Sequence, residues 1–471
     1  MISMISPPVL DALLFQQRLE AADSQRRLQY KRNREYYNGI HKLPLKTRTG
    51  QPDDNIVINL ARLVVDKGAS FLFGKEVIFE LQEGEQTEAE TMLSLIWQRN
   101  RKMTFLGKLA VTGGIYGHVF IKIVPDGIIE GVPRLISLDP EYVSVFYDDQ
   151  DIDNVYGYRI EWSGADRNGR AIHRRQDVQK DDSGRWSIVN RVNRGGTDWE
   201  PDSQNPDMMW DWDWPPIIDC QNIAMPGDYY GLSDLEDLSE QDAINYVASK
   251  INRILRYHSH PKTIGKGFAP KDIKIAEDDT IVLPSSESEL FNLEMQSDLG
   301  ASLAYLDRLT NWFLATARIP RIDPAVVQVG AMSGFALKVL YGDLYEKTEI
   351  KRRTYGDMLV ELNRRLCEME GYGEDNITTP HWPDPLPEDY AASQVRDTFD
   401  LDYELASKET VRARRGLDNE VEIERRRTEE AEKGNVGALL LRNWQQAQGT
   451  LQQQGQQPMR GAAQQQQEAQ E

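Results

Sequence analysis

The chain has few cysteines, no long apolar run and no excess of positive charge. Cys220 and Cys367 are the two cysteines of 471 residues, and their distance in sequence excludes a disulfide framework and a cysteine-based zinc finger. No stretch approaches about 18 uninterrupted apolar residues, and the first residues lack a basic leader followed by an apolar core. We therefore expect a protein made in a reducing cytosol, without membrane insertion.

The acidic balance limits how the chain could meet nucleic acid. Lys and Arg number 55 and Asp and Glu number 75, which gives a net charge of −20. A field of that sign repels phosphates unless basic residues cluster, so a general DNA binder held by a basic surface is excluded. The length is sufficient for two to four domains with a substantial core.

Motifs for catalysis and for cofactor or metal binding are missing. Residues 68–75 resemble a phosphate-binding loop, but they contain one residue too many between the glycines, and Glu76 stands where Ser or Thr is required. His258 and His260 could ligate a metal, but no third ligand is evident nearby, and Pro261 marks a helix end. No Gly-x-Ser-x-Gly motif is present. We expect no catalytic residue, no cofactor and no metal.

The first 160 residues have the pattern of a mixed α+β domain. A helix is expected over residues 9–37 and another over 59–74, with Leu60, Leu63, Val64 and Phe71 on one face. Strand patterns follow at 77–81, 118–124 and 142–147.

Residues 162–214 contain six of the ten tryptophans and short strand-like segments. Trp210, Trp212 and Trp214 alternate with Asp211 and Asp213, so a strand here would have one indole face and one carboxylate face. A β-hairpin packed on the domain or on a neighbouring subunit is the first interpretation. Stacking on a carbohydrate or a base is the alternative, and the adjacent acids disfavour a polyanion.

Two helices flanking a small insert are expected in the middle of the chain. The first starts at a capping box, Ser233 to Glu236, and carries an apolar seam of Ile244, Val247, Ile251 and Ile254. The second carries the apolar residues Leu299, Leu303, Leu306, Leu309 and Phe313. The insert of about 262–296 includes a strand at 281–284.

An apolar loop and a very long helix follow. Pro320 and Pro324 bracket the start of the loop, which is rich in small apolar residues although turns are usually polar. The helix from Ser333 to about Met369 contains no proline and would be roughly 55 Å long. A proline-rich connector, further helices to about Lys433 and a Gln-rich, disordered tail complete the chain.

The order of these features resembles the portal protein of tailed bacteriophages, in particular the SPP1-type family. The segments that carry the resemblance are Tyr36 to His41, residues 59–74, Asp139-Pro140 leading to Asp148-Asp149, Ser333 to Lys338, and Ser407 to Thr410. Each segment is weak alone, but the five in order form a fairly specific pattern.

The resemblance implies an α+β, mainly helical portal fold assembled into a ring. Its regions would be a wing (1–226), a stem helix (233–260), a clip (261–297), a second stem helix (298–319), a tunnel loop (320–332), a long wing helix (333–371), a connector returning to the wing (372–388), a crown (389–440) and the disordered tail (441–471). The protein would not be an enzyme.

The resemblance also implies partners and a location. Twelve copies would form the head-to-tail connector at a capsid vertex of the virion, after assembly in the host cytoplasm, and double-stranded DNA would pass through during packaging and ejection. The terminase large subunit, a head-tail adaptor, and capsid and scaffolding proteins would dock on the ring, with no membrane involved.

Candidate site residues follow from the same resemblance. The tunnel loop would touch DNA through Val326, Val327, Gln328, Val329, Ala331, Met332 and Ser333. Lys250, Arg253 and Arg256 could attract DNA in the stem, or form outward or inter-subunit salt bridges. Lys262, Lys266, Phe268 and Lys271 would bind partners at the clip.

The negative charge agrees with a conduit, because a channel with many phosphate contacts would bind DNA too tightly to let it slide. Two other classes remain open. One is a capsid or tail connector protein that does not thread DNA, and the other is a phage enzyme, for which no site is found.

Overall fold

A computed structural model describes residues 23–428, apart from 48–52, 82–87, 126–130, 149, 166–168, 182, 197, 237, 260–261, 268–273, 276–280, 283–284, 286, 294–298, 322–333, 374–376, 387–389, 416, 418 and 420. The chain divides into two compact units, Met1–Pro387 and Glu388–Glu471, which are treated separately. No described helix is long and apolar enough to cross a membrane.

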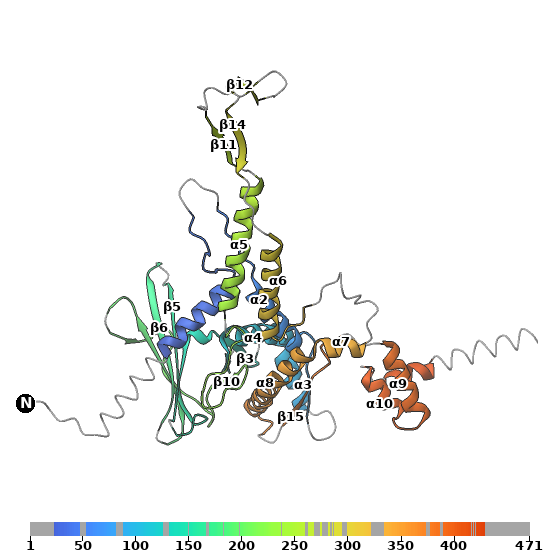
Figure 1. Ribbon diagram of the computed structural model, residues 1–471. Coiled ribbons are helices and arrows are strands. Elements are labelled where there is room, and N and C mark those ends of the chain that lie inside the picture. The colour runs from blue at the N-terminus through green and yellow to red at the C-terminus, as the bar shows by residue number, and fades with distance from the viewer. Residues whose placement is uncertain are drawn as a thin grey trace, which may run out of the picture. The chain divides into compact units, whose positions relative to one another are not determined.

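The first unit begins with helices packed on a small sheet (Figure 1). Residues 23–37 form the first helix, and α2 (Leu60–Phe73), α3 (Glu88–Arg99) and α4 (Lys102–Tyr116) follow. Asn59 caps α2, because its side chain accepts a hydrogen bond from the N–H of Arg62. The predicted α2 is confirmed, but its buried face differs from the prediction: Val64 and Phe71 are buried whereas Leu63 is 38% exposed.

Two sheets carry most of the strands. The three-stranded sheet has the order β10 (Ile217–Gln221), β2 (His118–Val124), β3 (Arg134–Leu138), and β10 and β2 pack against α8 and α4 respectively. Gly117 has φ +82° and makes the turn between α4 and β2. The six-stranded sheet comprises β4 (Val143–Tyr147), β5 (Val155–Ala165), β6 (Ala171–Lys180), β7 (Trp186–Asn193), β8 (Glu200–Pro201) and β9 (Met208–Met209).

The expected strand over the alternating tryptophans is wrong. Residues 211–214 form bends, and the three indoles gather into one cluster, with the Trp212 and Trp214 rings stacked at 5.5 Å. Trp210 and Trp214 are buried in the core, and Nε1 of Trp214 donates to Glu368 on α8. Packing against α8 therefore overrides the period-two pattern, although the interpretation of indoles packed on the domain is confirmed.

The two middle helices are α5 (Ser239–Ser259) and α6 (Leu299–Thr316), which pack against each other. Helix α5 starts six residues later than predicted, because Ser233 does not cap it. The Ser233 hydroxyl instead donates to the carbonyl of Ile115 and accepts from the N–H of Leu235. Beyond α5, β11 (Lys262–Lys266) pairs with β14 (Glu289–Leu293), and β12 (Lys274–Ile275) pairs with β13 (Ile281–Val282).

The expected long helix is divided at Tyr341 into α7 (Gly334–Leu340) and α8 (Gly342–Met369). Gly342 is a weak helix former, and the Tyr341 ring stacks on Phe71 at 5.4 Å, which accounts for the break. After α8, β15 (Thr378–His381) returns to pair with β1 (Ile78–Leu81). The second unit contains α9 (Tyr390–Asp402), α10 (Lys408–Arg414) and a helical segment at 421–428.

Candidate functional site: the stem and its attachment

A ladder of buried polar side chains fixes α5 to an extended segment, residues 54–59, which we call the strap. Gln241, Asn245 and Ser249 are completely buried at successive helical turns of α5. The Asn245 Oδ1 atom accepts the N–H of Ile58 at 2.9 Å, and Ser249 Oγ accepts that of Ile56 at 2.9 Å. The partly buried backbone of the strap is therefore paired by side chains of α5 rather than by another strand.

The lower end of the ladder holds the start of α2. The Gln241 Oε1 atom accepts from the N–H groups of Leu60 (3.0 Å) and Ala61 (3.2 Å), while its Nε2 donates to the Ile58 carbonyl at 2.7 Å. These first N–H groups of α2 have no partner inside their own helix. Gln241 thus acts as a cap supplied by a different helix.

The upper end of the ladder is an ion-pair cluster. The Asp54 carboxylate is 3% exposed, and its Oδ2 atom lies 2.9 Å from Arg253 Nε and 2.8 Å from an Arg256 guanidinium nitrogen. Asn252 donates to the Asp54 carbonyl at 3.1 Å. Strap and α5 therefore run in opposite directions, with Asp54 near Arg256 and Leu60 near Gln241.

A buried charge cluster joins the segment before α5 to the helix α8. The Asp234 carboxylate is 1% exposed and lies 2.6 Å from Nζ of Lys351 and 3.0 Å from Nζ of Lys347. Burial alone would raise the pKa of Asp234, but the two ammonium groups outweigh it and hold that pKa below its usual value. Burial lowers the pKa of Lys351, and the Asp234 carboxylate opposes this only in part.

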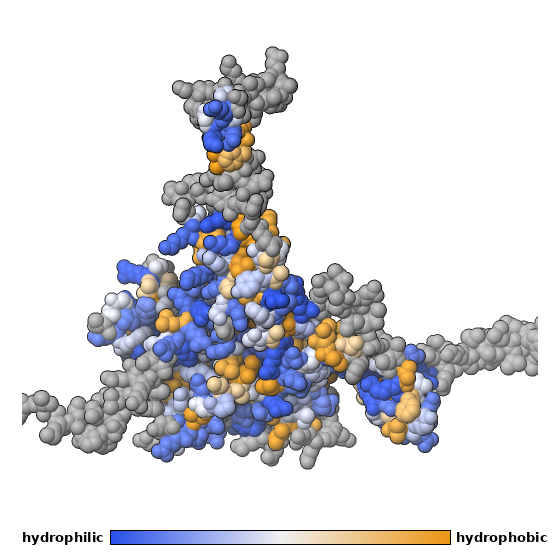
Figure 2. Space-filling model, in the orientation of Figure 1, coloured by the Kyte–Doolittle hydropathy of each residue, from blue (hydrophilic) through white to orange (hydrophobic). Residues whose placement is uncertain are grey.

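The outward face of α6 carries two large aromatic side chains among polar residues. Tyr305 is 50% and Trp312 is 55% exposed, and Arg308 is exposed between them. Leu309 and Phe313 are buried against the rest of the unit. Figure 2 shows hydrophobic residues (orange) reaching the surface along α5 and α6. Two exposed aromatic side chains on one helix face indicate a surface that another molecule covers.

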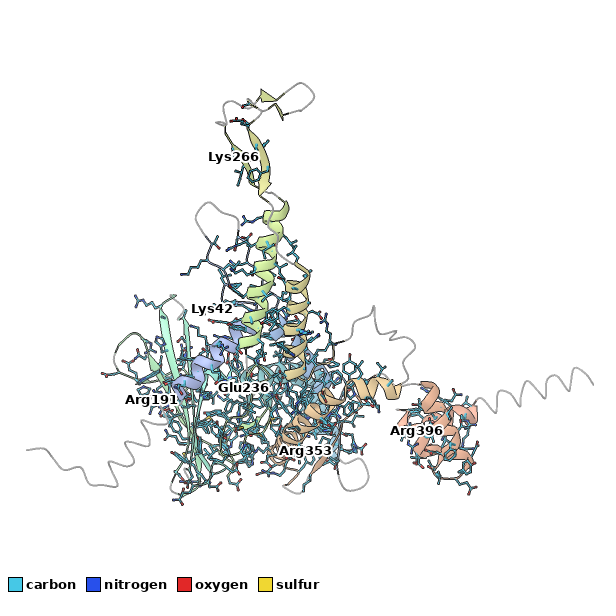
Figure 3. The ribbon with its side chains drawn as sticks, in the orientation of Figure 1. Lys42, Arg191, Glu236, Lys266, Arg353 and Arg396 are labelled. Atoms are coloured by element: carbon cyan, nitrogen blue, oxygen red, sulfur yellow. The ribbon has the colours of Figure 1, made fainter. Side chains whose placement is uncertain are left out.

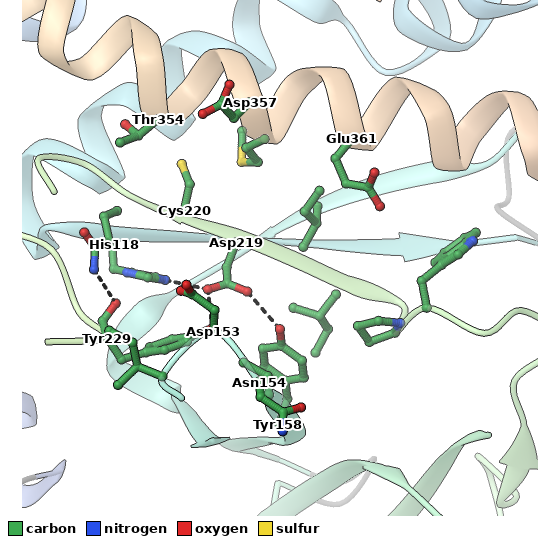
Figure 4. A pocket seen from close by; sticks show the side chains of 18 of the residues that line it. His118, Asp153, Asn154, Tyr158, Asp219, Cys220, Tyr229, Thr354, Asp357 and Glu361 are labelled. Atoms are coloured by element: carbon green, nitrogen blue, oxygen red, sulfur yellow. Dashed lines mark hydrogen bonds and ion pairs between the residues drawn. The ribbon is translucent and has the colours of Figure 1, made fainter. Parts of the chain in front are cut away.

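A separate cleft of about 830 Å³ lies where β10 meets α8 (Figure 4). Within it, the Asp219 carboxylate lies 2.7 Å from His118 Nε2 and accepts from the hydroxyls of Tyr229 (2.6 Å) and Tyr158 (2.9 Å). Burial, and then the Asp219 charge, raise the pKa of both tyrosines well above the usual value. Contacts with His118, Tyr229 and Tyr158 therefore occupy both oxygens of the Asp219 carboxylate, so this network has a structural role.

A family model for phage portal proteins of the SPP1 Gp6-like type matches residues 16–435. The chain belongs to this family. It is a family of structural proteins of the virion. Among curated proteins no sequence matches. One similar solved chain comes from the virion of a native gene transfer agent particle, with 13% identity, a TM-score of 0.40, and coverage of 79% of this chain and 96% of that one.

The structure places two of the three stem candidates in ion pairs within the chain. Arg253 and Arg256 both contact Asp54, so the two guanidinium groups share one carboxylate. The Lys250 ammonium lies 5.3 Å from the centre of the Tyr246 ring. A DNA-facing role for these residues stays a prediction.

The clip and loop candidates are only partly described. Lys266 lies on the β11–β14 hairpin beyond α5, where its ammonium is 3.2 Å from Glu289 (Figure 3). Lys262 is in β11. Phe268, Lys271 and the tunnel-loop candidates Val326, Val327, Gln328, Val329, Ala331, Met332 and Ser333 lie outside the described residues.

The segment 68–75, which resembles a phosphate-binding loop in sequence, has a structural role. Gly68 is inside α2, and Lys75, after the end of that helix, donates to the carbonyls of Asp384 and Leu386. The described residues contain no group of His, Cys, Asp and Glu that could hold a metal ion.

Sequence reasoning missed the ladder and the Asp234 cluster. A signal existed for the ladder, since Gln241, Asn245 and Ser249 are spaced by four on a helix. No local signal marks Lys347 and Lys351, because they lie on a helix with many charged residues and Asp234 is more than 100 residues away in sequence.

Proposed function

We propose that twelve copies of this chain form a closed ring at a capsid vertex, and that double-stranded DNA passes through its channel during packaging and ejection. Family membership supports this role, and the outward face of α6 supports the ring. Exposed Tyr305 and Trp312 need a cover that the chain itself does not provide among its described residues. In a ring, each copy covers part of its neighbour by heterologous contacts that close.

The regions are proposed as follows. The wing comprises residues 1–226 with α7 and α8, the stem comprises α5 and α6, the clip comprises residues 261–297, and the crown lies in the second unit. The terminase large subunit and later the head-tail adaptor dock at the clip, and capsid and scaffolding proteins surround the ring. The net charge of −20 supports passage of DNA, because a repelled polyanion slides more easily than a bound one.

Mass measurement tests the ring. Twelve chains of 53.9 kDa give about 647 kDa, and particles viewed along the axis would show a central hole. The double variant Tyr305→Asp/Trp312→Asp should give smaller species, because two charges would be buried in each contact. Leu28→Asp, which changes a 70% exposed leucine outside the stem, serves as the matched control. A wild-type monomer would contradict the proposal.

The tunnel loop needs a functional test. Val326→Lys/Val329→Lys should leave rings intact and impair DNA packaging, because added cations would hold phosphates. Normal packaging by this variant would refute DNA contact by the loop and would favour a connector that does not thread DNA.

A further inference from the structure

The described part of the second unit buries little apolar surface. Among its described residues, Val411 is the one buried apolar side chain. The other well-buried group is the Asp397 carboxylate, which lies 2.8 Å from Arg415 and 3.8 Å from Arg414. Helices that bury so little apolar surface are marginal unless something else covers them.

The same unit exposes an apolar stripe bordered by acids. Val395, Phe399 and Tyr403 follow helical spacing along α9 and its end, with 70%, 51% and 66% of their surface exposed. The rings of Phe399 and Tyr403 lie 4.4 Å apart. Asp402, Glu404 and one basic residue, Arg396, are exposed beside these apolar residues. We call Val395, Phe399, Tyr403, Asp402 and Glu404 the acidic stripe.

A second exposed patch has the opposite charge. Leu417 and Val421 are 42% and 45% exposed, and Arg425, Arg426 and Arg427 are exposed on the segment that follows. Arg425 lies 3.0 Å from Glu422, and Glu424 is also exposed, so the three arginines leave a net positive charge. We call Leu417, Val421 and these three arginines the basic patch. Because both surfaces are exposed in one copy, they do not cover each other within it.

We propose that the acidic stripe of one copy packs on the basic patch of the next copy. A contact between two acidic stripes would bring Asp402 and Glu404 against identical acids, and like charges repel. Pairing the acidic stripe with the basic patch joins opposite charges and buries apolar surface on both sides. Such a contact is heterologous and can continue around a ring. This inference rests on the proposed ring and names a second place where its subunits join.

Crosslinking between two differently tagged full-length chains tests the contact. One chain carries Phe399→Cys, the other carries Val421→Cys, and they are co-expressed and mildly oxidised after the ring mass has been checked. Since each chain has one added cysteine, a disulfide between the tags can form only between copies. Thr398→Cys, exposed beside Phe399 on α9, replaces Phe399→Cys in the control.

We expect the mixed-tag dimer to form at least ten-fold more with Phe399→Cys than with Thr398→Cys. Equal yields, or a predominance of dimers of the Phe399→Cys chain with itself, would overturn the contact. Intact rings without a mixed-tag dimer would also overturn it and leave the ring standing. A wild-type chain that does not assemble would overturn both.

Discussion

Replacing Asp234 by asparagine should destabilise the first unit, because Lys347 and Lys351 would lose their ion-pair partner. The carboxylate forms ion pairs with both Lys347 and Lys351, whose side chains are 12% and 3% exposed. Removing one member of a buried ion pair typically costs about 3–5 kcal/mol, because the remaining charge loses its compensation.

The cost has an upper limit set by proton release from Lys351. Starting from an ordinary lysine pKa of 10.5, neutralising that ammonium at pH 7 costs about 4.8 kcal/mol, at about 1.36 kcal/mol per pH unit. Unfolding the 387 residues of this unit carries an entropy of about 2.1 cal/mol/K per residue. Dividing a stability loss of about 4 kcal/mol by that total entropy gives a decrease in Tm of about 5 °C. We therefore expect Asp234→Asn to melt about 5 °C below wild type at pH 7.

The pH dependence distinguishes a charge effect from a packing defect. The folded pKa of Lys351 in the variant lies below its unfolded value, so the unfolded state binds more protons in that window and stability rises with pH. At pH 9.5 the neutralisation cost falls to about 1.4 kcal/mol, and the deficit in Tm should shrink to less than half.

Thermal unfolding followed by circular dichroism at pH 7 and 9.5, at one protein concentration, makes the comparison. Glu236→Gln is the matched control, since this exposed acid two residues away should change stability by less than about 0.5 kcal/mol. A Tm within 1 °C of wild type at pH 7, or an equal deficit at both pH values, would refute the reasoning.

Three further changes test the core by the same thermal unfolding. Gly113→Ala should be strongly destabilising, because its Cβ would lie 1.9 Å from the hydroxyl of Tyr355, whereas Gly107→Ala on the same helix meets nothing within 4 Å and should be neutral or slightly stabilising. Asn245→Ala should cost about 1–3 kcal/mol, because the buried N–H of Ile58 loses its partner; an unchanged Tm would contradict the ladder. Asp219→Asn should cost a similar amount, since an amide accepts fewer of the three donors; a variant as stable as wild type would show that the network contributes little.

Much of the element order was predictable, because its signals are local. Asn59 and Gly74 bracket α2 in the sequence and in the structure, and the apolar strand at 118–124 is β2 with the same bounds. The family resemblance was also carried by local segments, and family membership is confirmed.

The sequence-based predictions failed where residues distant in sequence determine the local structure. Ser233 has the spacing of a helix cap, but the carbonyl of Ile115, 118 residues away, uses its hydroxyl. The tryptophans alternate as in a strand, but the indole of Trp214 donates a hydrogen bond to Glu368 on α8. Arg253 and Arg256 were open to three roles, and their ion pairs with Asp54 could not be predicted because that carboxylate lies 199 or more residues away in sequence.

The polar ladder explains why α5 needs more than its apolar seam to hold one position. Ladder side chains four residues apart are separated by about 6 Å along α5, and strap residues two apart are separated by about 6.6 Å. Each ladder side chain therefore lies opposite a backbone group over the length of the strap. This match of spacings would also allow α5 to slip by one helical turn along the strap. The apolar contacts of α5 would not prevent the slip, because they carry little directional information. A slip would take Asp54 away from Arg253 and Arg256 and leave a buried carboxylate without its ion pairs, at a cost of several kcal/mol. The charges at the upper end therefore set the register of α5, and the amide and hydroxyl groups below pair the backbone of the strap.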